Sequence, residues 1–235
     1  MWDTFVNLDS DDTKTATNGR TSCMEYFSHY DDTWEVLAVE EPVIFNIGTY
    51  KYLVKLDLVV RLNGNIFVVE HKTTKNIGGN YFSRYMLNTQ MSAQTYACKE
   101  KYSSCSGVLL NVLSVKNVKK PVLIDPSNAE VKAYSQVEIK HSKYYGKPMA
   151  YCSGITFDFR REVVNRTPQQ LDDFITNVLH WIPRIEGEAF YPKNEHFCTS
   201  FKGCEFKELC FSCDDAQIKE QLYMKGEDPY AYMFR

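Results

Sequence analysis

The segment from Tyr52 to Thr74, YLVKLDLVVRLNGNIFVVEHKTT, constrains the fold of this chain more than any other stretch. Two runs rich in apolar and β-branched residues are separated by an Asn-Gly dipeptide at positions 63 and 64, which favours a tight turn between antiparallel strands. The sequence therefore predicts a β-hairpin. Its first strand carries one acid, Asp57, and its second ends in the triplet Glu70-His71-Lys72.

The charged residues of this hairpin are spaced so that they can share one face. Side chains alternate along a strand, so Glu70 and Lys72 point to one side and His71 to the other. The hairpin brings Asp57 beside them, and two adjacent carboxylates favour a hard divalent cation such as Mg2+ or Mn2+. The backbone carbonyl of His71 is a candidate extra ligand. Such a metal lowers the pKa of a bound water, and Lys72 can assist that water in attacking a phosphodiester.

A purely structural interpretation stays open, because acids and lysines at strand ends usually meet solvent. Asp57 fits that interpretation less well, since its neighbours favour burial and a buried unpaired carboxylate is costly. Glu40, which lies in an earlier predicted strand, is either a third acid of the site or a residue that faces solvent.

The hairpin residues resemble the motifs of the PD-(D/E)XK nuclease superfamily, in its RecB-like exonuclease branch as found in phage genomes. Asp57 matches the motif Asp, and Glu70-His71-Lys72 matches the (D/E)-x-K triplet. The resemblance extends to the C-terminal part of the chain, where FYPKNEHFCTSFKGCEFKELC is similar to the terminal cysteine motif of these nucleases. It covers about residues 34–210.

Relatives in this branch carry a Gln near an aromatic residue in the helix that follows the triplet. The segment NTQMSAQTYA offers Gln90, Gln94 and Tyr96. The usual spacing is Gln-x-x-x-Tyr, and here the fourth residue after Gln90 is Gln94. We favour Gln90 as the motif residue that orients the reaction, with Gln94 or Tyr96 sharing its role.

The resemblance implies a metal-dependent DNA exonuclease that acts on linear ends in phage recombination, replication or end processing. Asp57 and Glu70 would bind Mg2+ or Mn2+, and Lys72 would assist the attacking water. A recombinase or a helicase is a candidate protein partner. Many relatives also carry an upstream Gly-x-x-x-His and a Cys-Pro, and this chain has neither. The alternative is therefore a catalytically impaired nuclease-fold protein that binds DNA ends or a recombination partner.

The predicted elements follow the order of a restriction-endonuclease-like α/β core, in which helices flank a mixed central β-sheet. Residues 1–190 are expected to form this core, with 117–150 as an insertion that has few signals, and 191–235 a small cysteine-rich metal or cluster segment. The remaining predicted elements are a helix over 18–30, a strand over 34–47 bent at Pro42, a helix over 81–102, strands over 107–115 and 151–163, and a helix from the capping box at Thr167 to about residue 185.

Four of the eight cysteines lie close together in the last part of the chain: Cys198, Cys204, Cys210 and Cys213. Without a secretion signal, this pattern favours reduced thiols or metal ligation over disulfides. Only Cys210 and Cys213 have the Cys-x-x-Cys spacing, which makes zinc less favoured than an iron–sulfur cluster. The resemblance implies a [4Fe–4S] cluster on Cys198, Cys204 and Cys210, with Cys213, or Cys23 as runner-up, completing it. Free thiols are the structural alternative.

The formal net charge of −3 does not indicate a general nucleic-acid binder, but basic residues cluster in three places. The clusters are Lys116, Lys119 and Lys120; Lys140, His141, Lys143 and Lys147; and Arg160, Arg161 and Arg166. They either follow phosphates, with Tyr144 and Tyr145 stacking on bases, or are solvated loops and strand edges. No apolar run approaches the ~20 residues of a membrane span, and the polar N-terminus does not resemble a signal peptide. A cytoplasmic location without a membrane partner is expected, in the host cytoplasm if the protein is phage-encoded.

Overall fold

The computed structural model describes residues 16–187 and, after them, positions 204, 206, 208, 209, 216–222 and 226. The chain divides into two units, Met1–Val178 and Leu179–Arg235, and each is treated by itself. The described elements are α1 (Ala16–His29), β1 (Glu35–Ile47), β2 (Tyr50–Leu62), β3 (Asn65–Thr74), η2 (Ser83–Tyr85), α2 (Thr89–Tyr102), β4 (Val108–Ile124), η3 (Ala129–Ala133), β5 (Tyr134–His141), β6 (Pro148–Val164), α3 (Pro168–Gly187) and α5 (Ala216–Leu222).

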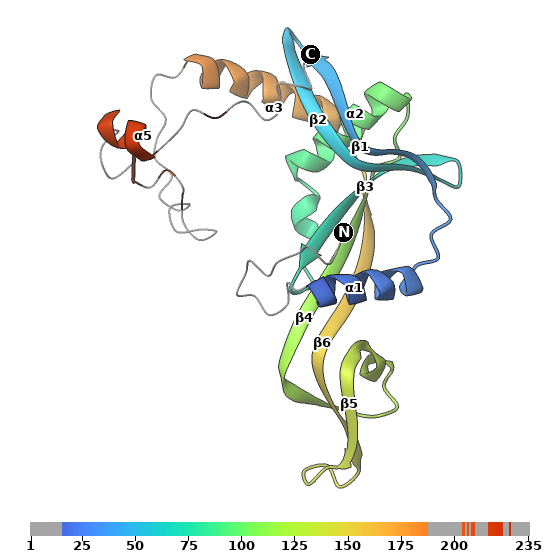
Figure 1. Cartoon of the computed structure of the whole chain (residues 1–235). Helices are drawn as coiled ribbons and strands as arrows, with labels where there is room; N and C mark the ends of the chain where they lie inside the picture. Colours follow the sequence, from blue (N-terminus) through green and yellow to red (C-terminus); the bar gives the residue numbers. More distant parts are fainter. Residues whose placement is uncertain are drawn as a thin grey trace. The chain divides into compact units, whose positions relative to one another are not determined.

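The first unit is built on one six-stranded mixed sheet in the order β1-β2-β3-β4-β6-β5 (Figure 1). The predicted hairpin is confirmed: β2 and β3 pair antiparallel from Leu58 opposite Val69 to Leu62 opposite Asn65. Asn63 and Gly64 have φ angles of 50° and 79°, and two positive φ values in succession are what a tight hairpin turn of this kind requires. The fold class is thus mixed α/β, with helices flanking the sheet.

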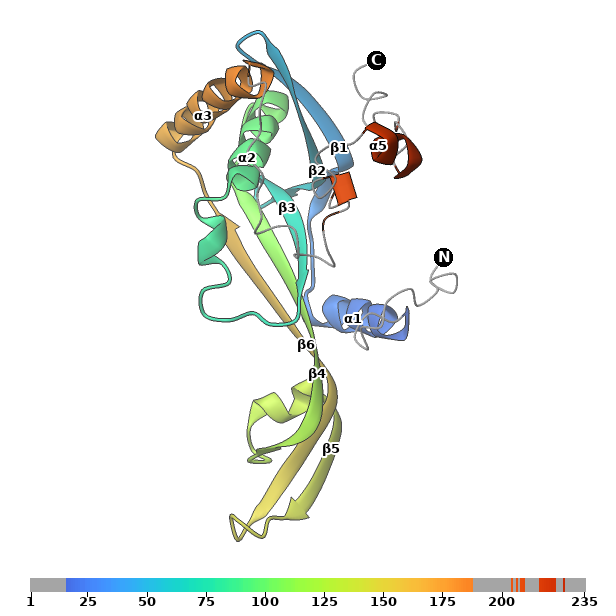
Figure 2. The ribbon, with the colours of Figure 1, turned by 90° about the vertical axis from the view of Figure 1, so that its left-hand side faces the viewer.

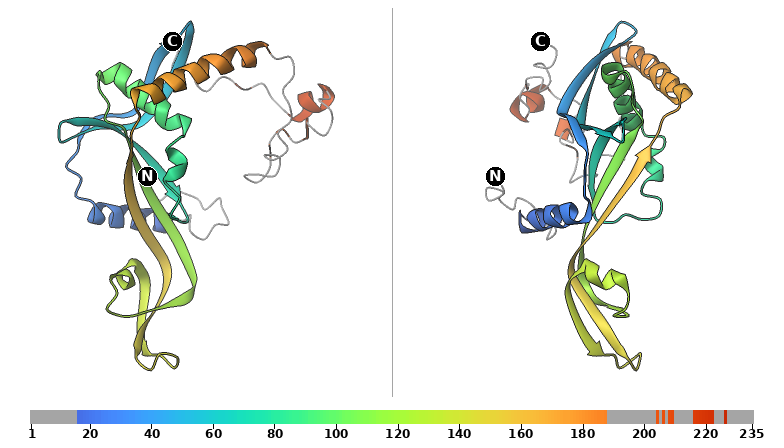
Figure 3. Two further views of the ribbon diagram at one scale, coloured as in Figure 1. Left: turned by 180° about the vertical axis from the view of Figure 1, so that it is seen from behind. Right: turned by 90° about the vertical axis from the view of Figure 1, so that its right-hand side faces the viewer.

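The parallel pair in this sheet explains where α2 lies. β3 and β4 run parallel from Val68 opposite Val108 to Thr74 opposite Ser114. Parallel neighbours need a crossover connection, and α2 supplies it after the hairpin. The helix packs its buried residues, among them Met91, Ala97 and Cys98, onto the main apolar core of the sheet. α2 and the first part of α3 cover one face of the sheet, and α1 lies against the other face (Figure 3).

The helix predicted over 81–102 is wrong at its start. α2 begins only at Thr89, because Asn88 is extended and its side-chain oxygen accepts a 2.8 Å hydrogen bond from the Gln90 backbone amide. The residues before this cap form a short 3₁₀ turn at Ser83–Tyr85 instead. The helix α3 does begin at the predicted capping box, where Thr167 and Gln170 exchange hydrogen bonds of 2.9 and 3.2 Å.

The strand predicted over 34–47 is present as β1, but its irregularity is not at Pro42. Pro42 lies in register opposite Lys55, and the register shift falls between Val36 and Ala38. A second irregularity is at Glu40, whose φ of 53° is unusual for a residue other than glycine in a strand.

Residues 117–150, expected to carry few structural signals, prolong the sheet. β4 continues to Ile124, β6 begins at Pro148, and β5 pairs along β6 from Tyr134 to His141. We call residues 116–156 the arm (Figure 2). Its own small core contains Ile124, Ala150 and Cys152, packed against Val131 and Tyr134. Gly154 has a φ of 99°, and a Cβ there would lie 2.1 Å from the Ser135 hydroxyl, so only glycine fits where β5 meets β6.

The second unit is described only at the end of α3, in α5 and at a few other positions. Cys198, Cys210 and Cys213, three of the four predicted cluster ligands, lie outside the described residues, and Cys204 is a half-buried free thiol. The cluster therefore stays a prediction. Within the described ranges, no helix is both long enough and apolar enough to cross a membrane.

Candidate active site

The predicted acids meet where β2 and β3 separate. Pairing between these strands ends at Leu58 opposite Val69, so Asp57 and Glu70 are the first residues beyond the ladder on each strand. Glu70 is 3% exposed, and its carboxylate Oε1 lies 2.5 Å from the Lys72 ammonium. The alternation of β3 thus places Glu70 and Lys72 together, as the sequence predicted.

Two glutamines from α2 complete the surroundings of the Glu70 carboxylate. Gln90 Nε2 donates to Glu70 Oε1 over 2.9 Å, and Gln94 Nε2 donates to Glu70 Oε2. Lys72 Nζ also donates to Gln90 Oε1 over 3.3 Å, which closes a ring of three polar side chains. The structure therefore brings both candidate glutamines to the site, one turn of α2 apart.

The amide of Gln94 leaves one strong acceptor unused. Gln94 is only 2% exposed, and its Oε1 is a buried oxygen with no hydrogen-bond partner among the residues described. A buried acceptor in this state costs about 1–3 kcal/mol relative to a satisfied one. An orphaned oxygen beside a carboxylate is suited to a donor or cation that binds from outside.

The surroundings of Asp57 disfavour its charged form. Burial raises the pKa of the Asp57 carboxyl above its usual value, and the nearby negative charge of Glu70 raises it further. The His71 backbone amide, which hydrogen-bonds to Asp57, acts in the opposite direction, and Glu40 adds a weaker upward effect on the pKa. A cation bound between the two carboxylates would offset the effect of the Glu70 charge on Asp57.

The available donors fit a hard divalent metal that retains much of its own hydration. Asp57, Glu70 and the His71 carbonyl are all oxygen donors, and Mg2+ is commonly held by one or two carboxylates together with waters and substrate. In the described part of the chain, no group of three or more His, Cys, Asp or Glu side chains could by itself hold a metal. The candidate site therefore offers two acids and depends on backbone, water and substrate oxygens for the rest.

Glu40 is adjacent to this site by strand register. It lies between the pairs Val39–Leu58 and Glu41–Leu56, opposite Asp57. Its carboxylate forms an ion pair with Lys55, and more than half of its side chain is exposed. The third acid is thus near enough to affect the pKa of Asp57, while its own contact is with a lysine at the surface.

Tyr96 is not part of the polar cluster. Its ring lies 5.0 Å from that of Phe45 and 6.3 Å from that of Phe174, within the apolar core under α2. Burial raises the pKa of its hydroxyl, as does a hydrogen bond with Glu100. Of the two residues expected to share the role of Gln90, Gln94 or Tyr96, the structure brings only Gln94 to Glu70, because the turn of α2 that points Gln94 at Glu70 points Tyr96 at the core.

The opposite face of β3 carries a second polar cluster, which sequence reasoning missed. Asn111 Nδ2 lies 3.0 Å from His71 Nδ1 and donates to the Tyr26 hydroxyl over 2.7 Å. Arg161 Nε donates to Asn111 Oδ1 over 3.2 Å, and its two terminal nitrogens each donate to Asp32 over 2.6 Å. The Arg161 guanidinium also stacks on aromatic rings, with its central carbon 3.5 Å from the centre of the Tyr30 ring and 4.4 Å from that of Trp34.

Arg166 is a further residue that the motifs did not reveal. It is 9% exposed and donates to the Ser92 hydroxyl over 2.8 Å and to the carbonyls of Tyr85 and Asn88, each over 3.1 Å. These bonds hold the cap of α2 and hence the start of the helix that carries Gln90. Arg161 and Arg166 are therefore internal crosslinks, so neither interpretation of the third basic cluster, phosphate binding or solvated edge, describes them.

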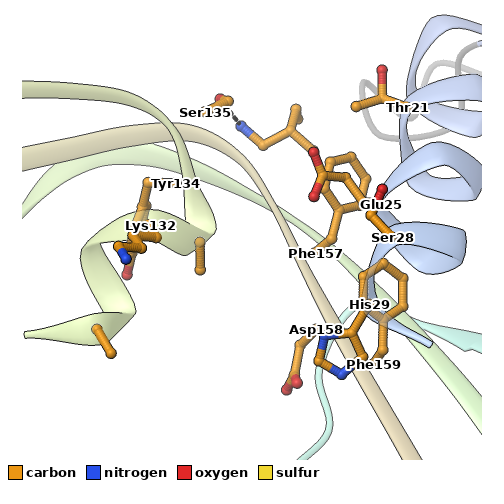
Figure 4. A pocket seen from close by; sticks show the side chains of 13 residues that line it. Thr21, Glu25, Ser28, His29, Lys132, Tyr134, Ser135, Phe157, Asp158 and Phe159 are labelled. Carbon is orange, nitrogen blue, oxygen red and sulfur yellow. Dashed lines mark hydrogen bonds between the residues drawn. The ribbon is translucent and has the colours of Figure 1, made fainter. Parts of the chain in front are cut away.

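A hollow of about 520 Å³ lies between α1 and the base of the arm, and none of the residues around Glu70 lines it (Figure 4). Glu25, Ser28 and His29 of α1 line one side, and Lys132 and Tyr134 line the other. Phe157, Asp158 and Phe159 of β6 form its third wall. Its mixture of acids, bases and aromatic rings indicates no single ligand chemistry.

Comparisons with known proteins establish no family for the chain. No protein-family model matches it, and no curated protein does. Its structure is similar to the crystal structure of SSO0001 with a TM-score of 0.39 and 13% sequence identity, over 84% of this chain and 70% of that one. A likeness of this size identifies neither an activity nor a substrate.

Proposed function

We propose that this chain is a metal-dependent deoxyribonuclease with a restriction-endonuclease-like core, of the RecB-like branch of the PD-(D/E)XK superfamily. One observation carries the proposal. The buried Glu70 carboxylate is held by Lys72, Gln90 and Gln94 beside a second carboxylate, Asp57, whose pKa is raised. Two neighbouring carboxylates, one of them with a raised pKa, together with a buried acceptor left unpaired on Gln94, form a combination typical of functional sites.

The roles follow from where each group lies. Asp57 and Glu70 would hold Mg2+ or Mn2+, which supplies a Lewis acid for the phosphate and a water of lowered pKa. Lys72, which is partly exposed and already contacts Glu70, would steady the attacking water and the charge that develops on the phosphate. Gln90 bridges Lys72 and Glu70 and would keep both in position during the attack.

The test is the degradation of end-labelled linear DNA with Mg2+ or Mn2+, comparing the natural chain with Lys72→Ala. We expect cleavage that is abolished both by the substitution and by EDTA. Lys51→Ala is the matched control, because Lys51 is exposed in the turn region between β1 and β2, where it pairs with Asn46. Cleavage that survives Lys72→Ala, or is lost equally in Lys51→Ala, would refute this assignment of the site.

One observation favours the alternative, a protein that binds DNA ends without cutting them. Lys72, Gln90 and Gln94 all contact the carboxylate of Glu70, leaving it little free capacity for a metal. In the alternative, Lys72 is a permanent counter-ion. DNA binding that is unaffected by Mn2+, together with a complete lack of cleavage by the folded protein, would favour it.

The same proposal includes the cysteine segment and the biological setting. Cys198, Cys204, Cys210 and Cys213 would hold a [4Fe–4S] cluster, and the enzyme would process DNA ends in phage recombination or replication. Iron content with an absorption band at ~400 nm would support the cluster, whereas bound zinc or metal-free protein would contradict it.

A further inference from the structure

The arm is basic although the chain as a whole is acidic. Residues 116–156 contain seven lysines and only three acidic residues, whereas the formal net charge of the whole chain is −3. The excess positive charge is thus concentrated on one projecting part of the sheet (Figure 2). A polyanion is attracted to such a local concentration even when the net charge of the protein is negative.

Most of these lysines are not neutralised within the described structure. Lys140 pairs with Glu138 and Lys147 with Asp125, each over 2.7 Å. Lys119, Lys120 and Lys143 are exposed and form no ion pair with a described acid. Lys119 and Lys120 lie in the β4 bulge between Val118 and Val122, where pairing with β6 is interrupted.

The tip of the arm adds aromatic rings to this charge. Tyr144 is 88% exposed and Tyr145 is 59% exposed, in the turn that joins β5 to β6. Their backbone amides are fixed by the Ser142 hydroxyl, which accepts hydrogen bonds of 3.2 and 3.3 Å from them. An ordered turn that holds two rings out into solvent is a platform on which unpaired bases can stack.

A protective role explains only part of this pattern. Lysines, a proline and a bulge are common devices that keep an open strand edge from pairing with other chains, and Lys119, Lys120 and Pro121 fit that role. The two exposed tyrosines at the tip do not protect an edge in this way, because they add apolar surface where protection requires charge. Edge protection can therefore account for the bulge, whereas the tip calls for a bound ligand.

We propose that the arm is a docking site for single-stranded DNA, with Lys119, Lys120 and Lys143 binding phosphates and Tyr144 and Tyr145 stacking on bases. The choice of DNA rests on the proposed nuclease function, and the arm defines the form in which the substrate is held. Four residue steps along β6, from Pro148 to Cys152, separate the tip from the bulge. That distance is roughly 13 Å, the span of about four phosphates of one strand. The hollow at the arm base does not share this role, because Glu25 and Asp158 would repel phosphates.

The first experiment measures the binding of a fluorescent single-stranded oligonucleotide in EDTA, so that cleavage plays no part. We expect Lys119→Glu/Lys120→Glu to raise Kd at least tenfold at moderate salt. We also expect the slope of log K against log salt to become shallower by about 1.4, or ~0.7 for each phosphate that a lysine no longer neutralises. The control is Lys51→Glu/Lys99→Glu, which makes the same charge change outside the arm, near the start of β2 and in the last turn of α2. An equal loss of binding in the control, or an unchanged Kd and slope in the arm variant, would overturn the proposal.

The second variant, Tyr144→Ala/Tyr145→Ala, tests the stacking. Because both rings are exposed, the fold should be unaffected, and we expect Kd to rise at least fivefold with an unchanged salt slope. An unaltered Kd would refute the stacking role and would be the expected result if the arm docks a protein. These measurements stand apart from the Lys72→Ala cleavage test, so either idea can fail alone.

Discussion

The two faces of β3 carry polar clusters of similar size and opposite character. On one face, Glu70 is surrounded by Lys72, Gln90 and Gln94, and a buried oxygen of Gln94 is left without a partner among the described residues. On the other face, the nitrogens of Arg161 donate to Asp32, Tyr26 and Asn111, and aromatic rings cover the guanidinium. The comparison teaches that burial of charge does not by itself mark a site. The cluster around Glu70, in which an oxygen has no described partner, is the candidate for catalysis. The cluster around Arg161 links α1 to the sheet through Tyr26.

Removing the charge of Glu70 should have the largest effect on activity. Glu70→Gln keeps the size of the side chain, and the amide of Gln94 can turn so that its unpartnered oxygen accepts from the new amide. We expect cleavage of linear DNA to fall at least ~100-fold, while the thermal unfolding midpoint stays close to that of the natural chain. A variant that cleaves normally would place the chemistry elsewhere.

Removing Arg161 should act on stability instead. Arg161→Ala leaves Asp32 as an uncompensated, partly buried charge, and we expect a loss of about 3 kcal/mol in the free energy of unfolding, measured by urea denaturation. Arg160→Ala is the matched control, because Arg160 and Asp158 form an exposed pair worth under ~0.5 kcal/mol. Cleavage per folded molecule should be retained in both. Its loss in Arg161→Ala alone would mean that the two faces of β3 are not independent.

A divalent metal should stabilise the protein through the face of β3 that carries Glu70, and not through the Arg161 cluster. At a concentration about one hundred times its Kd, Mn2+ contributes about 2.7 kcal/mol, which raises the unfolding midpoint by ~5 °C or more for a chain of this size. We expect Asp57→Asn to abolish this rise and Arg160→Ala to preserve it, as followed by thermal melts with and without EDTA. An equal rise in Asp57→Asn would show that the metal binds at another place.

The smallest expected effect is the pH dependence due to Asp57. Because its pKa is raised in the folded state, its contribution to stability is fully present below the ordinary value of 3.8 and is lost as the pH rises through the raised pKa. Without metal, Asp57→Asn should therefore be more stable than the natural chain at pH 7, by less than ~1 kcal/mol. The difference should shrink on acidification towards pH 4. A variant that is less stable at pH 7 would contradict the raised pKa.

The local parts of the site could be predicted from the sequence. Asp57, Glu70 and Lys72 belong to one hairpin, and strand alternation with an Asn-Gly turn determines their relation. The start of α2 could not be placed in this way, because the apolar pattern runs through the 3₁₀ turn and only the Asn88 side chain marks the boundary. The choice between Gln94 and Tyr96 was left open for a related reason: the motif gives the spacing along the helix but not the rotation of the helix on the sheet.

The long-range parts could not be predicted. Arg161 meets Asp32 across 129 positions, and Arg166 meets Asn88 across 78, so no local pattern connects them. The arm was missed because neither β5 nor the first half of β6 shows, by itself, an apolar pattern that predicts a strand. They become strands by pairing with each other and with the extension of β4. Side chains that satisfy one another only in three dimensions leave no trace in the spacing of a single sequence.

The continuity of β4 gives the molecule a mechanical property. The strand runs without a break from Val108, beside the hairpin, to Ile124 in the arm, and its residue Val112 lies opposite Lys72. Tension applied at the tip would enter β6 at Pro148 and pass through the antiparallel ladder to β4, and so to the residues beside Glu70. Because β4 and β6 are antiparallel and would be pulled along their length, their hydrogen bonds would share the load in shear instead of opening one after another. A force on the tip of the arm would therefore also load β4, the strand beside Glu70.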